Sequence, residues 1–87
     1  MKLYRIEHID RFEVHHCFAR SEKQLGRMFV AWCEVMHGDA PRYFSTKRIR
    51  IDDVLPGQRL HLAAALARKC RGAGSYHPEI GWVIEPI

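Results

Sequence analysis

The sequence predicts an α+β domain in which about four strands form one sheet and two helices cover one face of it. Three observations lead to this prediction: alternating apolar and polar residues near the start, two segments with helical periodicity, and breaks rich in Gly or Pro between them. The 87 residues suit a single domain, 1–87, with one modest core. The predicted element order is ββαβαβ, arranged as a two-layer sandwich.

An alternating pattern predicts two strands at the start of the chain. In residues 2–8, Tyr4, Ile6 and His8 fall on one side. Residues 12–19 alternate in the same way, and the polar break 9–11 separates the two segments. We therefore predict a β-hairpin.

Residues 21–37 have the most regular helical pattern. Ser21, followed three residues later by Gln24, is a capping box at the start, and Gly38 is a natural end. The apolar residues recur at steps of three and four, so this stripe is predicted to face the core. It consists of Leu25, Met28, Phe29, Trp32 and Met36.

The second half of the chain adds a strand, a helix and a short last strand. Residues 43–51 are rich in aromatic and β-branched residues and predict a third strand. A turn at Pro56-Gly57 leads to a predicted helix over 59–71, which Gly72 and Gly74 end. Residues 76–81 are predicted to be a loop, and 82–84 the last strand.

Charge is distributed unevenly along the chain. The formal net charge is +4. Eight basic residues and only two acidic ones lie between Arg42 and Arg71, whereas the rest of the chain is slightly acidic. Such a segment favours an acidic partner, so we predict a nucleic acid, an acidic protein or a nucleoprotein complex.

Strand alternation assigns this basic segment to a surface. Phe44, Arg48 and Arg50 share one side of the third strand, which is predicted to be the open face of the sheet, while Ile49 and Ile51 face the core. The guanidinium groups would hold phosphates and the aromatic ring would stack on bases, with salt dependence typical of about six phosphates. The predicted anion-binding residues are Phe44, Lys47, Arg48, Arg50, Arg68 and Arg71. The alternative is a solvated strand face, with basic residues at a helix C-terminus because the dipole favours them.

Two other functions remain open on the sequence. Tyr76 and Trp82 would serve, together with a sheet edge, as contacts of a protein-interaction or inhibitor module. Trp82 and Ile84 share one face of the last strand, and the alternative is that Trp82 packs over the second helix. Cys33 and His37 lie four apart on one helix face, which allows a small zinc-stabilised domain, although core packing explains Cys33 more simply. We predict no metal site and no cofactor.

Catalytic motifs and processing signals are not apparent in the sequence. No phosphate loop, GxSxG or HExxH is present, so we predict that the protein is not an enzyme. The cysteine count is odd, at three, with no CxxC pair, and this indicates free thiols in a reducing compartment. Early charges interrupt any leader, so a cytoplasmic location is predicted, with no membrane association.

The layout of the first half of the chain resembles that of small phage and mobile-element proteins, including some anti-CRISPR proteins. The hairpin residues Tyr4-Arg5-Ile6 and 12–19 lead into the helix through Ala19-Arg20-Ser21-Glu22-Lys23-Gln24-Leu25, and a basic strand follows. The likeness covers about 50 residues at the level of organisation. It implies a non-enzymatic protein that binds a host nucleoprotein complex, as an inhibitor or regulator.

Overall fold

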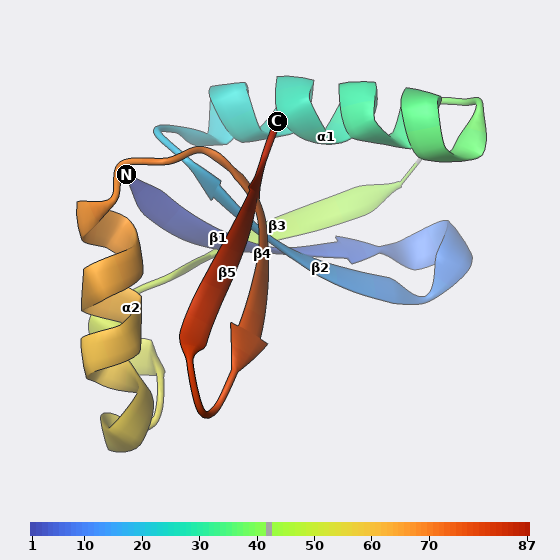
Figure 1. The fold of residues 1–87 in the computed structure, drawn as a ribbon. Coiled ribbons are helices and arrows are strands. Elements are labelled where there is room, and N and C mark those ends of the chain that lie inside the picture. Colours follow the sequence, from blue (N-terminus) through green and yellow to red (C-terminus); the bar gives the residue numbers. More distant parts are fainter. Residues whose placement is uncertain (42) are drawn as a thin grey trace.

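One antiparallel five-stranded sheet organises the structure, a computed structural model that describes residues 1–41 and 43–87. The strand order is β3-β1-β2-β4-β5 (Figure 1). Arg42, which belongs to the predicted basic segment, lies outside the described residues. The elements are β1 (Lys2–His8), β2 (Glu13–Ala19), α1 (Glu22–His37), β3 (Phe44–Ile49), α2 (Arg59–Ala67), β4 (Gly72–His77) and β5 (Gly81–Pro86), with 3-10 turns at Ile9–Arg11, Ile51–Asp53 and Pro56–Gln58.

The α+β class and the first hairpin are confirmed, but the strand count is wrong by one. Residues 72–77 form strand β4, which pairs with both β2 and β5, although Gly72 and Gly74 were predicted to end the second helix and residues 76–81 to form a loop. Its sequence, Gly-Ala-Gly-Ser-Tyr-His, has little intrinsic strand preference, so pairing with its neighbours decides its conformation. The second helix correspondingly ends at Ala67 and not at Arg71.

The two helices lie on opposite faces of the sheet, which overturns the prediction that both cover one face. Tyr4 and Ile6 pack with α1 residues in one buried cluster. Leu3 packs with Leu62 of α2 in a second cluster. Neighbouring residues of one strand point to opposite faces, so β1 contributes to both cores. In Figure 1, α1 crosses the top of the view and α2 runs down its left side.

Helix α1 begins and ends as predicted. Gln24 N donates to Ser21 Oγ over 3.2 Å, and Gly38 ends the helix with a φ of +81°. Leu25, Met28 and Phe29 are buried, but Met36 is 61% exposed, so the predicted core stripe stops before the last turn.

Strands β2 and β4 pair at three positions only, and then separate. The paired positions are His16 with Gly74, Cys17 with Ala73, and Phe18 with Gly72. Figure 1 shows the β4–β5 hairpin turning steeply away from β1 and β2. Within the described ranges, no helix is long and apolar enough to cross a membrane.

Candidate anion-binding site

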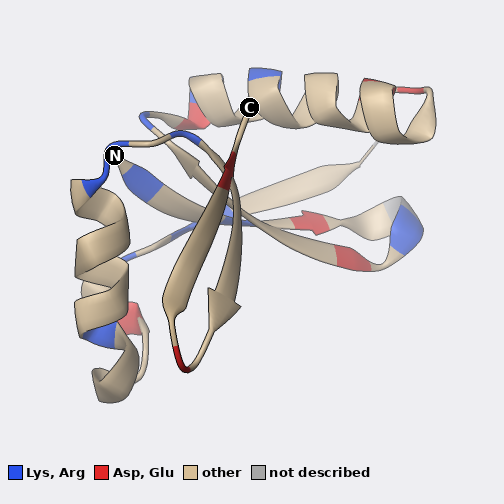
Figure 2. Ribbon diagram, in the orientation of Figure 1, with Lys and Arg blue, Asp and Glu red and all other residues tan. Residues whose placement is uncertain are grey.

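A small basic hollow lies where the first strand, the start of α1 and the end of α2 meet. It has a volume of about 260 Å³ and is lined by Met1, Arg20, Gln24, Lys69 and Arg71. We call this set the basic hollow. In Figure 2, Lys and Arg segments from these separate elements gather near the start of β1. Among the described residues, no Asp or Glu side chain belongs to the lining, so an anion placed there would meet mainly cationic groups.

The capping of α1 positions one wall of the basic hollow. Arg20 N donates to Gln24 Oε1 over 2.7 Å, while Gln24 N donates to Ser21 Oγ. These reciprocal bonds fix the turn that brings the Arg20 side chain, which is exposed, to the start of the helix. The capping box therefore sets both the helix start and the position of one cation.

The end of α2 positions the other wall. Lys69 has a φ of +52°, in the left-handed region that residues with a Cβ avoid, and its N–H donates to Leu66 O over 3.2 Å. This reversal directs the chain from the helix into β4. Arg71 then donates from Nε to Ile87 O over 3.2 Å, which anchors the guanidinium beside the hollow.

The predicted basic strand is divided between surfaces. Lys47 pairs with Arg5, and Arg48 pairs with Tyr4. Because neighbouring residues of a strand point to opposite faces, the side chains of Lys47 and Arg48 lie on opposite faces of the sheet. Arg48 acts electrostatically on Tyr4. Burial and the negative charge of Glu22 raise the pKa of Tyr4, whereas the positive charge of Arg48 lowers it. Arg48 is exposed, but it lies on the side of the sheet that α1 covers and not on an open face.

The residues that flank this strand also differ from the prediction. Arg50 lies beyond β3, where its N–H donates to Asp53 Oδ2 over 2.8 Å. The exposed Ile51 begins a 3-10 turn and does not face the core, although Ile49 does. Phe44 packs against the α1 core with its ring 5.0 Å from that of Phe29, which removes it as a free platform for base stacking.

Arg68 and Arg71 both bond to the C-terminal segment. Arg68 donates from Nη1 to Trp82 O over 2.8 Å, so this predicted anion ligand is partly engaged within the protein. Of the six predicted residues, the structure brings only Arg71 into the basic hollow. Sequence reasoning missed Arg20, Gln24 and Lys69, although Lys69 lies within the basic segment and the capping box marked Gln24.

Trp82 is a core residue, so its predicted role as an exposed interface contact is wrong. Its side chain is 7% exposed and packs with Phe18 and Leu62. The ring of the half-buried Tyr76 lies 5.4 Å from that of Trp82, so both aromatics help to join the β4–β5 hairpin to α2. Trp82 and Ile84 share one face of β5, and this is the face that α2 covers.

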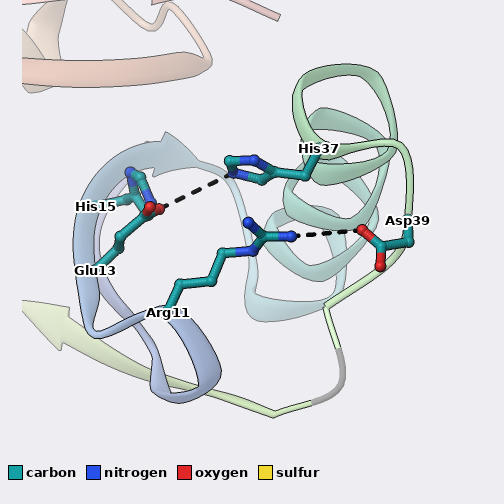
Figure 3. A network of polar contacts seen from close by, with 5 residues as sticks. All are labelled: Arg11, Glu13, His15, His37 and Asp39. Atoms are coloured by element: carbon teal, nitrogen blue, oxygen red, sulfur yellow. Dashed lines mark hydrogen bonds and ion pairs between the residues drawn. The ribbon is translucent and has the colours of Figure 1, made fainter.

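A polar network ties the β1–β2 turn to the end of α1 (Figure 3). His15 Nε2 and Glu13 Oε2 are 3.0 Å apart, and His37 Nε2 is 4.0 Å from the same oxygen. Arg11 and Asp39 form a second ion pair at 3.5 Å. His37 thus faces the carboxylate of Glu13 (Figure 3). Among the described residues, no three His, Cys, Asp or Glu side chains are grouped so that they could hold a metal ion.

Two of the three free thiols are sequestered. Cys17 and Cys33 are buried, whereas Cys70 is half-buried. Burial raises the pKa of Cys17 to about 11, and burial also raises that of Cys33. Thiols with raised pKa values are poor nucleophiles, because the thiolate is the reactive form.

Comparison with protein-family models, with curated proteins and with solved structures gives no match for this chain.

Proposed function

We propose that the protein is a non-enzymatic binding module that docks on nucleic acid, alone or within a nucleoprotein complex, through the basic hollow. The observation that supports this proposal is the meeting of Arg20, Lys69 and Arg71 at one concave site with no lining Asp or Glu among the described residues. Arg20 is distant in the chain from Lys69 and Arg71, so the fold brings two separate segments together at this site. Phosphate groups match the donors that guanidinium and ammonium groups offer.

One further cation lies near the basic hollow in the sheet. Lys2 of β1 pairs with Ala19, the residue before Arg20. Contacts to phosphate position a nucleic acid without reading its bases, so we expect weak sequence preference and strong salt dependence.

An inhibitory or regulatory role is part of the proposal. It is supported by the resemblance to small mobile-element proteins, and by a cationic surface suited to covering phosphates that another protein would otherwise contact. The free thiols suit a reducing compartment, so we also propose a cytoplasmic location.

Fluorescence anisotropy with short DNA and RNA, at two salt concentrations, tests the proposed site. The variant Arg20→Gln/Lys69→Gln removes two cations from the basic hollow, and we expect the slope of log affinity against log salt to fall by about 1.8 for duplex DNA. The matched control, Arg48→Gln/Arg50→Gln, removes the same charge from β3 and its flank. If the control weakens binding as much as the first variant, the basic hollow is not the docking site.

A second candidate function, protein interaction, is favoured by one exposed aromatic residue. Phe12 is 95% exposed and has a φ of +53°, so neither packing nor backbone preference explains a phenylalanine there. Exposed aromatic residues are frequent anchors in protein interfaces. A pull-down from nuclease-treated lysate with the wild type and with Phe12→Ser tests this candidate: a partner that survives nuclease and is lost in the variant supports it.

A further inference from the structure

The sheet contains a fork between β2 and β4 that leaves strand edges without partners. β2 pairs with β1 from Glu13 to Ala19, and β4 pairs with β5 from Gly72 to His77. Between β2 and β4, however, pairing stops at His16 and Gly74. The inner edges of 13–15 and 75–77 therefore face a gap, and alternate residues along them direct backbone N–H and C=O groups into it.

A pocket opens on each face of the sheet at this fork. The pocket on the α1 side has a volume of about 330 Å³, and the one on the α2 side about 650 Å³. Val14, His16 and Tyr76 line both pockets. The two pockets are thus halves of one cleft that passes between the separated strands.

Short side chains on β4 keep the cleft open. Gly74 is required by packing, because a Cβ there would lie 2.7 Å from Phe18 Cε2 and 3.2 Å from Trp82 Cε3. That packing does not reach Ala73 and Ser75, which line the α1-side pocket with small groups.

We propose that the fork accepts an extended peptide segment of a partner protein as an added strand along the inner edge of residues 13–15. An extended segment satisfies the unpaired backbone groups of β2, and its side chains alternate between the two faces. One set of its side chains enters the α1-side pocket and the other set enters the α2-side pocket. No other common peptide conformation meets both requirements at once.

The linings define which side chains the segment carries. Ile6, Phe29 and Trp32 line the α1-side pocket, so the guest residues on that side are apolar. The α2-side pocket combines apolar residues with Arg5 and His16. Asp53 also lines it, and Arg5 forms an exposed ion pair with Glu7 at 3.1 Å. Because these charges balance, the α2 side suits polar, uncharged guest residues such as threonine.

The probe is a short acetylated peptide of alternating valine and threonine. Two copies serve as comparisons: one with alternate backbone nitrogens methylated, and one with lysine in place of the central valine, which the apolar α1-side pocket should reject. Binding is measured by calorimetry and by amide chemical shifts of the full chain. We expect shifts centred on 13–15 and 75–77, with binding at least about tenfold weaker for each copy.

Matched variants locate the site. Val14 is 48% exposed and lines both pockets, whereas Val83 is 45% exposed, lies on β5 and lines neither. Val14→Gln should weaken the peptide about tenfold, and Val83→Gln should leave it unchanged. Equal binding of the methylated copy would overturn the strand pairing, and so would shifts confined to the outer edge of β5. Absence of binding by the unmodified peptide would overturn the proposal as a whole. Loss of nucleic-acid binding in the basic-hollow variant has no bearing on these outcomes.

Discussion

Replacing Lys69 with glycine should separate the charge of this residue from its conformation. With a φ of +52°, Lys69 occupies a backbone region that costs a residue with a Cβ about 1–2 kcal/mol, a cost that glycine avoids. Glycine in turn loses about 0.5–1 kcal/mol through the greater freedom of its unfolded chain. The exposed side chain contributes no buried contact. The free energy of unfolding should therefore stay the same or rise by up to about 1.5 kcal/mol.

In contrast to stability, anion binding should be weakened by the replacement of Lys69 with glycine. If the three cations of the basic hollow each neutralise one phosphate of duplex DNA, the salt slope is about −2.7, and affinity falls roughly fortyfold between about 50 and about 200 mM salt. Loss of Lys69 leaves a slope of about −1.8 and a fall of roughly twelvefold. These values are smaller than those expected for about six phosphates, because the fold distributes the basic segment over several surfaces.

Phe12→Gly is the matched control for this experiment. Phe12 has nearly the same φ, +53°, and is 95% exposed, but it belongs to the β1–β2 turn at the other end of the sheet (Figure 1). Urea unfolding should show a similar change in both variants, and anisotropy should show a reduced salt slope only for Lys69→Gly. An unchanged slope in Lys69→Gly, or a loss of more than about 1 kcal/mol of stability, would refute the role assigned to Lys69.

Three further outcomes test the core around the fork. Gly74→Ala should lower the free energy of unfolding by about 1–3 kcal/mol in urea, because its Cβ would meet Phe18 and Trp82 at 2.7 and 3.2 Å; an unchanged value would show that the vertex of the fork is loosely packed. The Cys17 pKa of about 11 lies above its ordinary value of 9.0, so the unfolded thiol ionises first. Stability should hold below pH 9 and fall above it, by up to about 1.4 kcal/mol per pH unit, whereas Cys17→Ala should flatten this decline. Burial, Arg5 and His15 lower the pKa of His16 below 6.5, so stability should be retained above pH 6.5 and decrease on acidification; His16→Gln should reduce that decrease in pH-dependent thermal melts.

The helix α1 shows how far local patterns reach. Its capping box, its buried face and its terminal glycine all act within a few residues of one another, so the sequence alone placed the helix to within one residue. The hairpin of β1 and β2 could be predicted for the same reason, because its strands are adjacent in the chain and their apolar and polar residues alternate clearly. By contrast, the capped start of α1 does not indicate that Arg20 meets Lys69, which lies at the far end of another helix.

Strand β4 and the placement of the helices depended on tertiary contacts. The Gly- and Ala-rich start of β4 has little strand preference, and its conformation comes from β2 and β5 on either side. Alternation in β1 places Leu3 on one face of the sheet and Tyr4 and Ile6 on the other. It does not indicate which helix covers each face, because the two-residue period relates only residues of the same strand. The sequence by itself therefore determined the α+β class, the first hairpin, helix α1 and the excess of positive charge. Tertiary structure alone decided the opposite placement of the helices, the fork and the basic hollow, since each of these joins residues that are distant along the chain and come together only when both cores are packed.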